Sequence, residues 1–123
     1  MEFDELSNRV IGCAIEVHRI LGPGLLENTY KQCLVYEILQ KNMKVLSEVE
    51  LPVMYKDVQI ACGYRIDLLV EDALVIELKC VEKILPIHEA QLLTYMKLAN
   101  MRTGLLINFN EKMLKHGINR FVL

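Results

Sequence analysis

The sequence lacks the features of several common functional classes. It contains no apolar run close to the roughly 20 residues that a membrane helix needs, and its acidic start, MEFDELS, carries no apolar signal segment. Its four cysteines form no CxxC pair, which argues against a zinc site and favours free buried thiols. These absences predict a cytoplasmic protein that does not bind membranes.

The sequence also lacks an excess of basic residues. Its formal net charge is −2, whereas a strongly basic nucleic-acid-binding domain would be positive. Nucleic acid is still compatible with this balance, because carboxylates that hold metal ions count as negative charges. Hydrophobic residues make up 53% of the 123 residues, which is enough for a core, and no repeat or linker divides the chain. We therefore expect a single domain over residues 1–123.

The spacing of apolar residues predicts two helices in the first third of the chain. Residues 6–21 show the period of an amphipathic helix, and Gly22-Pro23-Gly24 ends it. A second helix is predicted over about residues 25–42. After Asn42 the residues become β-prone and mostly alternate between apolar and polar.

Strands and one further helix account for the rest of the chain. Four strands are predicted next, at about residues 45–55, 58–62, 64–70 and 74–79. Pro86 suits the first turn of a third helix that continues to about Asn100, and a buried strand follows at residues 103–109. Residues 119–123 are predicted to form a short edge strand. The order α-α-β-β-β-β-α-β indicates an α/β fold with a mixed β-sheet of four to five strands flanked by helices, joined by a right-handed crossover.

Charged residues interrupt an otherwise apolar hairpin, GYRIDLLVEDALVIELK, at residues 63–79. With the turn centred on Asp72, Leu68 faces Ile76 and Asp67 faces Glu77 across the ladder. One face of the hairpin is then almost wholly apolar and holds Tyr64, Ile66, Leu68, Val70, Leu74, Ile76 and Leu78. The other face holds Arg65, Asp67, Leu69, Val75, Glu77 and Lys79. The charges are therefore gathered on one face.

This arrangement places two carboxylates side by side. Facing residues have Cβ atoms about 5 Å apart, so Asp67 and Glu77 repel each other unless a positive group lies between them. Lys79, one step along the same face, supplies part of that charge, and a divalent cation would supply more. Hard oxygen ligands on a strand pair suit Mg²⁺ or Mn²⁺. The alternative is a solvated patch of surface ion pairs.

Four motifs, in this order along the chain, resemble those of the PD-(D/E)XK nuclease superfamily. Asp67, then nine residues and ELK at residues 77–79, is similar to its D…ExK core, although Ile66 precedes Asp67 in place of proline. GLLENTY at residues 24–30 resembles the GxxExxY signature of one family in the superfamily. QLLTY at residues 91–95 resembles the QxxxY motif of its RecB-like branch. The resemblance runs from about residue 10 to the C-terminus and implies a restriction-endonuclease-like core.

The resemblance also implies a metal-dependent active site. Asp67 and Glu77 would hold the cation, with the backbone carbonyl of Leu78 as a further ligand. Glu27 would add a carboxylate that reaches the metal or its waters, although an acidic residue there is also expected to stabilise the helix dipole. Lys79 would orient or deprotonate the attacking water and balance charge on the phosphate.

Other side chains are candidates for the rim of this site. Gln91 and Tyr95 share a helix face and would line the substrate path, Gln91 as a catalytic residue and Tyr95 in substrate binding; the alternative is a solvated amide and a core tyrosine. His18 is a candidate metal ligand, because some RecB-like nucleases use a histidine near this point, and His88 is a further candidate. Arg65 would contact the substrate. A wider basic rim could include Lys83, Lys97, Arg102, Lys112, Lys115 and Arg120.

Three functions are compatible with these observations. The first is an Mg²⁺- or Mn²⁺-dependent nuclease that hydrolyses phosphodiester bonds, in DNA rather than RNA. The second is a catalytically inactive interaction module that works with a partner protein, and the third is a metal-dependent phosphoesterase acting on RNA or a small substrate. The joint presence of the motif residues favours an enzyme. The acidic balance and the lack of an added DNA-reading module favour the inactive module. A core this small without such a module would also grip a duplex poorly, which predicts a homodimer or a partner protein.

Overall fold

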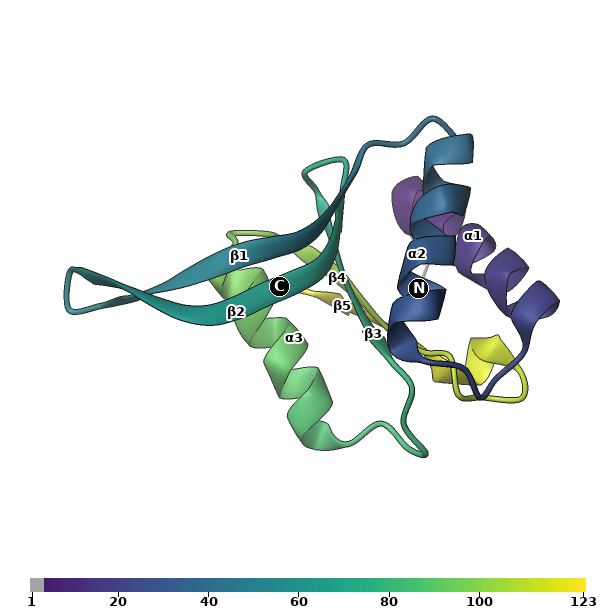
Figure 1. Ribbon diagram of the computed structural model, residues 1–123. Coiled ribbons are helices and arrows are strands. Elements are labelled where there is room, and N and C mark those ends of the chain that lie inside the picture. The colour runs from purple at the N-terminus through teal and green to yellow at the C-terminus, as the bar shows by residue number, and fades with distance from the viewer. Residues whose placement is uncertain (1–3) are drawn as a thin grey trace.

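The computed structural model describes residues 4–123, and Figure 1 shows a twisted sheet with helices packed against it. In chain order the elements are α1 (Glu5–Leu21), α2 (Glu27–Gln40), β1 (Val45–Tyr55), β2 (Val58–Val70), β3 (Leu74–Lys79), α3 (Pro86–Leu98), β4 (Thr103–Asn108), the short 3-10 helix η1 (Leu114–Gly117) and β5 (Ile118–Val122).

Capping residues set the ends of the helices. Asp4 accepts a hydrogen bond from the N–H of Ser7 at 2.7 Å and so caps α1. Gly22, with φ at 68°, ends the same helix in a conformation that glycine adopts without strain. Pro86 stands in the first turn of α3. The three predicted helices are confirmed, although α2 is shorter at both ends than predicted.

The five strands form one mixed sheet in the order β1-β2-β3-β4-β5. β3 and β4 are parallel because α3 connects them, and the other neighbours are antiparallel. β1 and β5 are the two edges, and the predicted edge strand at the C-terminal end is confirmed. The predicted α/β fold, a mixed sheet flanked by helices, is therefore confirmed.

Alternate residues of the central strands face different helices. Ile76 and Leu78 belong to the cluster that packs under α1 and α2, whereas Val75 belongs to the cluster under α3. On β4, Leu105 belongs to the cluster under α1 and α2, and Leu106 belongs to the cluster under α3. The sheet is thus covered on both faces, and Figure 1 shows β3 descending between α2 and α3.

The element order differs from the prediction in the hairpin of β1 and β2. Residues 58–62 and 64–70 were expected to be separate strands, but they form the single strand β2, so three strands rather than four precede α3. Gly63 has φ at 77°, and the pairing register shifts between Leu51 and Val53. The ladder therefore continues through an irregularity of the β-bulge kind instead of ending there.

The β2–β3 hairpin has the predicted register but not the predicted faces. Leu68 pairs with Ile76, as expected. Ile66, which was expected on the same face as Leu68, packs instead in the cluster under α3. In the neighbouring strand β1, Glu48 has φ at 54° opposite this point. The alternation of faces along β2 is therefore broken between Leu68 and Ile66, and Ile66 packs in the other layer.

Beyond this twist, β1 and β2 extend outward as a two-stranded arm, which we define as residues 52–63 (Figure 1). Most arm residues are exposed, including the apolar side chains of Met54, Tyr55 and Val58. The arm leaves the sheet on the side where α3 lies, so that its base and α3 face each other.

The structure tests what was expected of the cysteines and of membrane-spanning helices. The four cysteines are free thiols, as expected, but only Cys13 is buried, and Cys62 is exposed on the arm. The expectation that all of them are buried is therefore wrong. Within residues 4–123, none of the helices combines the length and the apolar character needed to cross a membrane.

Candidate active site

Asp67 and Glu77 meet where the ladder between β2 and β3 gives way to side-chain contacts. Backbone pairing extends to Leu68 and Ile76. Beyond it, the N–H of Asp67 donates to Glu77 Oε1 at 3.0 Å, and the N–H of Leu78 donates to Asp67 Oδ2 at 2.8 Å. Each carboxylate therefore bonds the backbone of the opposite strand, and the two groups lie together as the register requires.

Burial makes Glu77 an unfavourable place for a negative charge. The residue is only 5% exposed. Burial, followed by the charge of Asp67, raises the pKa of Glu77 to about 8. The hydrogen bond from the Asp67 N–H and the charge of Lys79 act in the opposite direction without offsetting the burial. At neutral pH the protein alone therefore favours a protonated Glu77.

Glu27 brings a third carboxyl group to the same region from the first turn of α2. The residue is exposed, yet partial burial of its carboxyl group, followed by the charge of Asp67, raises its pKa. The charges of Lys79 and Lys31 lower it. Three elements, β2, β3 and α2, thus place acidic groups within electrostatic reach of one another.

Tyr30 explains why Glu27 begins its helix at this place. The tyrosine is fully buried and stacks on Phe109, with ring centroids 4.6 Å apart. Its hydroxyl donates to the carbonyl of Gly22 and accepts from the N–H of Leu25 at 3.1 Å. Both contacts hold the loop that leads into Glu27. Tyr30 itself belongs to the hydrophobic core under α1 and α2.

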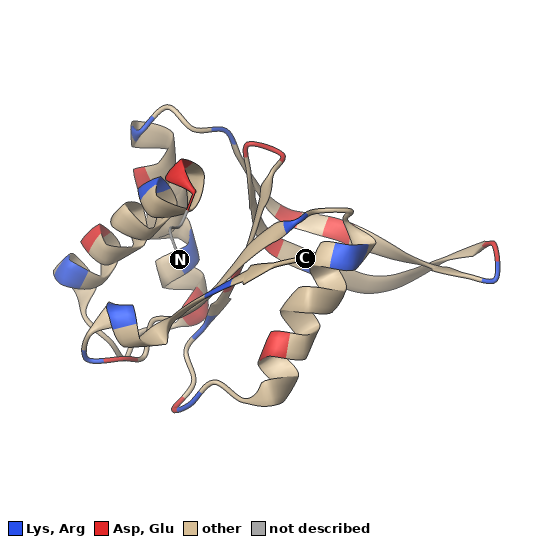
Figure 2. Cartoon of the chain, turned by 180° about the vertical axis from the view of Figure 1, so that it is seen from behind, with Lys and Arg blue, Asp and Glu red and all other residues tan. Residues whose placement is uncertain are grey.

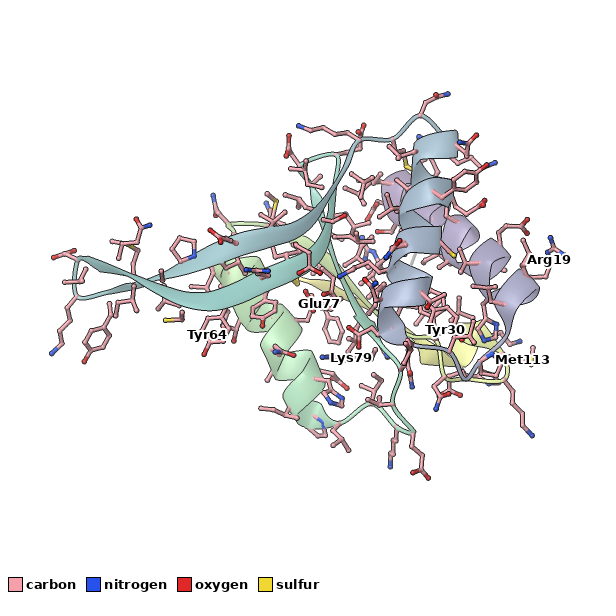
Figure 3. All side chains as sticks on the ribbon, in the orientation of Figure 1. Arg19, Tyr30, Tyr64, Glu77, Lys79 and Met113 are labelled. Carbon is pink, nitrogen blue, oxygen red and sulfur yellow. The ribbon has the colours of Figure 1, made fainter. Side chains whose placement is uncertain are left out.

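Lys79 is held by α3 on the other side of the carboxylates. Its Nζ donates to Gln91 Oε1 at 3.3 Å, and Gln91 Nε2 donates to the Tyr95 hydroxyl at 3.0 Å. Tyr95 is 7% exposed, and burial followed by the charge of Glu77 raises its pKa. Figure 3 shows Glu77 and Lys79 in the space between α2 and α3. The two residues of the QxxxY motif thus position the lysine of the ExK motif.

Asn108 fixes the chain just after Lys79, and our sequence analysis missed it. Its buried side chain donates to the carbonyl of Val81 at 2.9 Å and accepts from the Val81 N–H at 3.1 Å. The N–H of Phe109 also donates to the carbonyl of Lys79 at 2.9 Å. The signal that could have found Asn108 is an amide inside the buried strand GLLINF.

Lys31 and Glu48 form an ion pair beside Glu27, and both were also missed. Lys31 lowers the pKa of Glu27, and Glu48 raises it. Lys31 could have been found, because it lies four residues after Glu27 on the same helix face. Glu48 could not, because its position depends on the pairing and twist of β1 against β2.

The carboxyl groups suit a hard divalent cation. Among residues 4–123, no preformed cluster of three or more histidine, cysteine, aspartate or glutamate side chains has the spacing of a metal site. The donors are nevertheless of the type that a hard cation prefers, because Asp67, Glu77 and Glu27 all offer carboxylate oxygens. Asp67, Glu77 and Glu27 are therefore the residues that would hold a divalent cation of this kind.

His18, His88 and Arg65, the other residues predicted near the site, are described by their own contacts. His18 Nε2 is 2.6 Å from the backbone carbonyl oxygen of Glu111, and His88 Nδ1 accepts from the N–H of Leu85 at 2.9 Å. Arg65 is exposed on β2, in register with Glu50. The roles predicted for His18, Arg65 and the Leu78 carbonyl stay predictions.

The basic residues named as a possible rim include at least one with a different partner. Arg120, which we placed in it, forms an ion pair with Asp4 at the start of α1. Figure 2 shows lysine and arginine positions interspersed with acidic ones along the ribbon.

Comparison with known proteins agrees with this geometry. The family model described as the PD-(D/E)XK nuclease superfamily matches residues 4–121. No curated protein and no solved structure gives a significant match. Since the family model covers nearly the whole chain, from the cap of α1 to β5, the chain belongs to the PD-(D/E)XK nuclease superfamily.

Proposed function

We propose that the chain is an Mg²⁺- or Mn²⁺-dependent nuclease that hydrolyses phosphodiester bonds, in DNA rather than RNA. The observation that carries the proposal is the contact of Asp67 on β2 with Glu77 on β3, with Lys79 two residues after Glu77 on β3. Membership of the nuclease superfamily supports the same chemistry. One domain spanning residues 1–123, in the cytoplasm, is part of this proposal.

The acidic residues have the role of ligands in this proposal. Asp67 and Glu77, with Glu27 and the carbonyl of Leu78, hold the cation, and His18 is a further candidate. When bound, the cation supplies Lewis-acid polarisation of the phosphate and a more acidic water. Binding also removes the cost of ionising the buried Glu77, because the cation replaces its missing counter-charge.

Lys79, Gln91, Tyr95 and Arg65 act on the substrate. Lys79 donates to a non-bridging phosphate oxygen and orients the attacking water, which stabilises charge that develops in the transition state. Gln91 and Tyr95 restrict where the lysine ammonium group can reach, through the two hydrogen bonds that link them. Arg65 neutralises a neighbouring phosphate from the exposed side of β2.

We further assign the chain to the GxxExxY family and to the RecB-like branch. The first assignment is supported by the way Tyr30, the last residue of GLLENTY, holds the loop before Glu27. The second is supported by the contact of Gln91 with both Lys79 and Tyr95. A homodimer or a partner protein would supply the grip on a long substrate that a core of this size lacks.

The inactive interaction module remains the second candidate function. It is favoured by the lack of a preformed metal cluster among residues 4–123, and by the raised pKa of Glu77, which weakens the acidic pair as a ligand in the isolated protein. A phosphoesterase that acts on RNA or a small substrate would use the same residues, so substrate choice decides between it and the DNA nuclease.

Cleavage assays on matched variants test the proposal. With Mg²⁺ or Mn²⁺, the protein is expected to cut single-stranded, duplex or branched DNA, and Asp67→Asn, Glu77→Gln and Lys79→Ala each lower the rate by at least about 100-fold. Asp57→Asn and Glu82→Gln change the same groups at exposed positions and should leave the rate unchanged. RNA and a chromogenic phosphodiester serve as the competing substrates. Cleavage that survives in all three site variants, or that never appears, rejects the nuclease.

A further inference from the structure

A groove of about 490 Å³ lies between α3 and the base of the arm. Val53 and Tyr64 line it from the two strands, and Ile87, Ala90 and Leu98 line it from α3. Its volume falls in the range of pockets that hold small organic groups. The sequence analysis had placed Tyr64 on the apolar face of the hairpin with Leu68, but its ring lies near that of Tyr95 on α3.

The groove is continuous with the candidate active site. Gln91 and Tyr95 line it too, and Gln91 accepts the hydrogen bond from Lys79. A phosphate that lies at Lys79 would therefore place the adjoining part of its nucleotide at the mouth of the groove. This continuity makes the groove part of the path that the substrate takes.

The lining of the groove fits a nucleobase better than a phosphate. Among its described lining residues none is lysine or arginine, and most of them present carbon atoms. Tyr64 is 46% exposed, and its ring lies 6.1 Å from that of Tyr95 at an angle of 54°. Tyr64 therefore offers an open aromatic surface for stacking, and stacking of a base on an aromatic side chain tolerates any sequence.

We propose that this groove holds an unpaired nucleobase of the substrate, stacked on Tyr64, next to the phosphate at Lys79. Bases of an intact duplex are stacked and paired inside the helix, so only an unpaired base can enter a side groove of this kind. The substrate class is therefore single-stranded nucleic acid, or the single-stranded part of a branched one. This inference rests on the proposed nuclease function, because it takes the phosphate position from that function.

Binding to the inactive variant Asp67→Asn, without divalent ions, tests the groove separately from catalysis. Fluorescence anisotropy compares a single-stranded oligonucleotide, its duplex and an abasic strand of the same length and charge. The single strand is expected to bind most tightly, and Tyr64→Ala or Tyr64→Leu in this background to weaken it about 5- to 150-fold. Tyr64→Phe keeps the affinity, and the abasic strand does not respond to any Tyr64 variant. DNA and RNA strands are measured in parallel.

Tyr36→Ala is the matched control, since Tyr36 is 61% exposed on α2, away from the groove. The inference is overturned if Tyr64→Ala binds like the parent, if the duplex or the abasic strand binds as well as the single strand, or if nothing binds. It is also overturned if Tyr64→Ala only converts a dimer to a monomer, because the groove would then be an interface between two copies.

These results separate the groove from the nuclease proposal. Binding that depends on Tyr64, together with no cleavage by the unmodified chain, rejects the nuclease and leaves the groove assignment standing. If Tyr64→Ala changes neither the KM nor the kcat of cleavage, the groove assignment is rejected and the nuclease proposal is not.

Discussion

Glu77 holds a carboxyl group that burial and the neighbouring Asp67 keep protonated at neutral pH. A buried acid of this kind opposes folding once it ionises, because its charge loses water without gaining an adequate partner. Its pKa is about 8 in the folded protein, against 4.5 for an ordinary glutamate. Glu77 therefore does not reduce the unfolding free energy below about pH 4.5, where it is protonated in both the folded and the unfolded chain. The unfolding free energy then falls as the pH rises from there through 8.

Glu77→Gln should therefore stabilise the metal-free protein at neutral and alkaline pH. Relative to the variant, the unmodified chain is expected to lose up to about 1.4 kcal/mol of unfolding free energy per pH unit between about pH 5 and 8. Urea unfolding in a chelator at pH 5, 7 and 9 measures the difference, with Glu82→Gln as an exposed control. If the unfolding free energies of the unmodified chain and of Glu77→Gln differ by the same amount at pH 5, 7 and 9, the account is contradicted.

Some residues of the site could be located from the sequence, and others could not. Asp67 and Glu77 could be brought together from strand alternation alone, because they belong to one hairpin and their neighbours pair in the predicted register. Glu27 belongs to a different layer, and only the resemblance pointed to it. Tyr64 was placed on the wrong side, since the strict alternation on which that prediction depended is broken between Ile66 and Leu68.

At the scale of elements, the parallel pair β3 and β4 positions Lys79. The side chain of Asn108 ties the end of β4 to Val81, just beyond the end of β3. The 3-10 helix η1 closes against the same place, because Gly117 has no side chain: a Cβ there would overlap the carbonyl oxygen of Asn108. Glycine is needed at this position for close packing and not for an unusual φ.

Gly117→Ala is expected to lower the unfolding free energy by about 1–3 kcal/mol, because the backbone of Asn108 must shift to make room. Gly12→Ala is the matched control: it lies in α1 with open space around it, and alanine should raise stability by up to about 1 kcal/mol. Thermal or urea unfolding of both variants checks the pair. If Gly117→Ala and Gly12→Ala change the unfolding free energy equally, close packing of Gly117 against Asn108 does not contribute to stability.

The elements themselves were largely predictable, and the exceptions have local causes. Helix periods and the Gly22 and Pro86 signals placed all three helices. The extra strand was predicted by dividing the segment at Gly63, whereas the ladder continues past this residue with a shifted register. Glycine marks a possible interruption in a strand, but the pairing with the neighbouring strand decides whether the strand ends.

At the scale of the whole molecule, the fold places the acidic pair between two helical layers. α2 delivers Glu27 from one side of the sheet, and α3 holds Lys79 through Gln91 from the other. Such a site depends on the native arrangement of both layers, so a cation that binds it must stabilise the whole chain against unfolding. The arrangement of helices on a mixed sheet could be predicted from the sequence, but the contacts that bring Glu27 and Lys79 to the acidic pair from opposite layers could not.

The measurement that tests the central claim most directly is the melting temperature with and without Mn²⁺. At ten times the dissociation constant, binding is expected to contribute about 1.4 kcal/mol and to raise the melting temperature by about 5 °C. Asp67→Asn should abolish this increase, and the exposed change Asp57→Asn should retain it. A melting temperature that does not respond to Mn²⁺, or that rises equally in Asp67→Asn, would contradict the claim that Asp67 and Glu77 together hold a divalent cation.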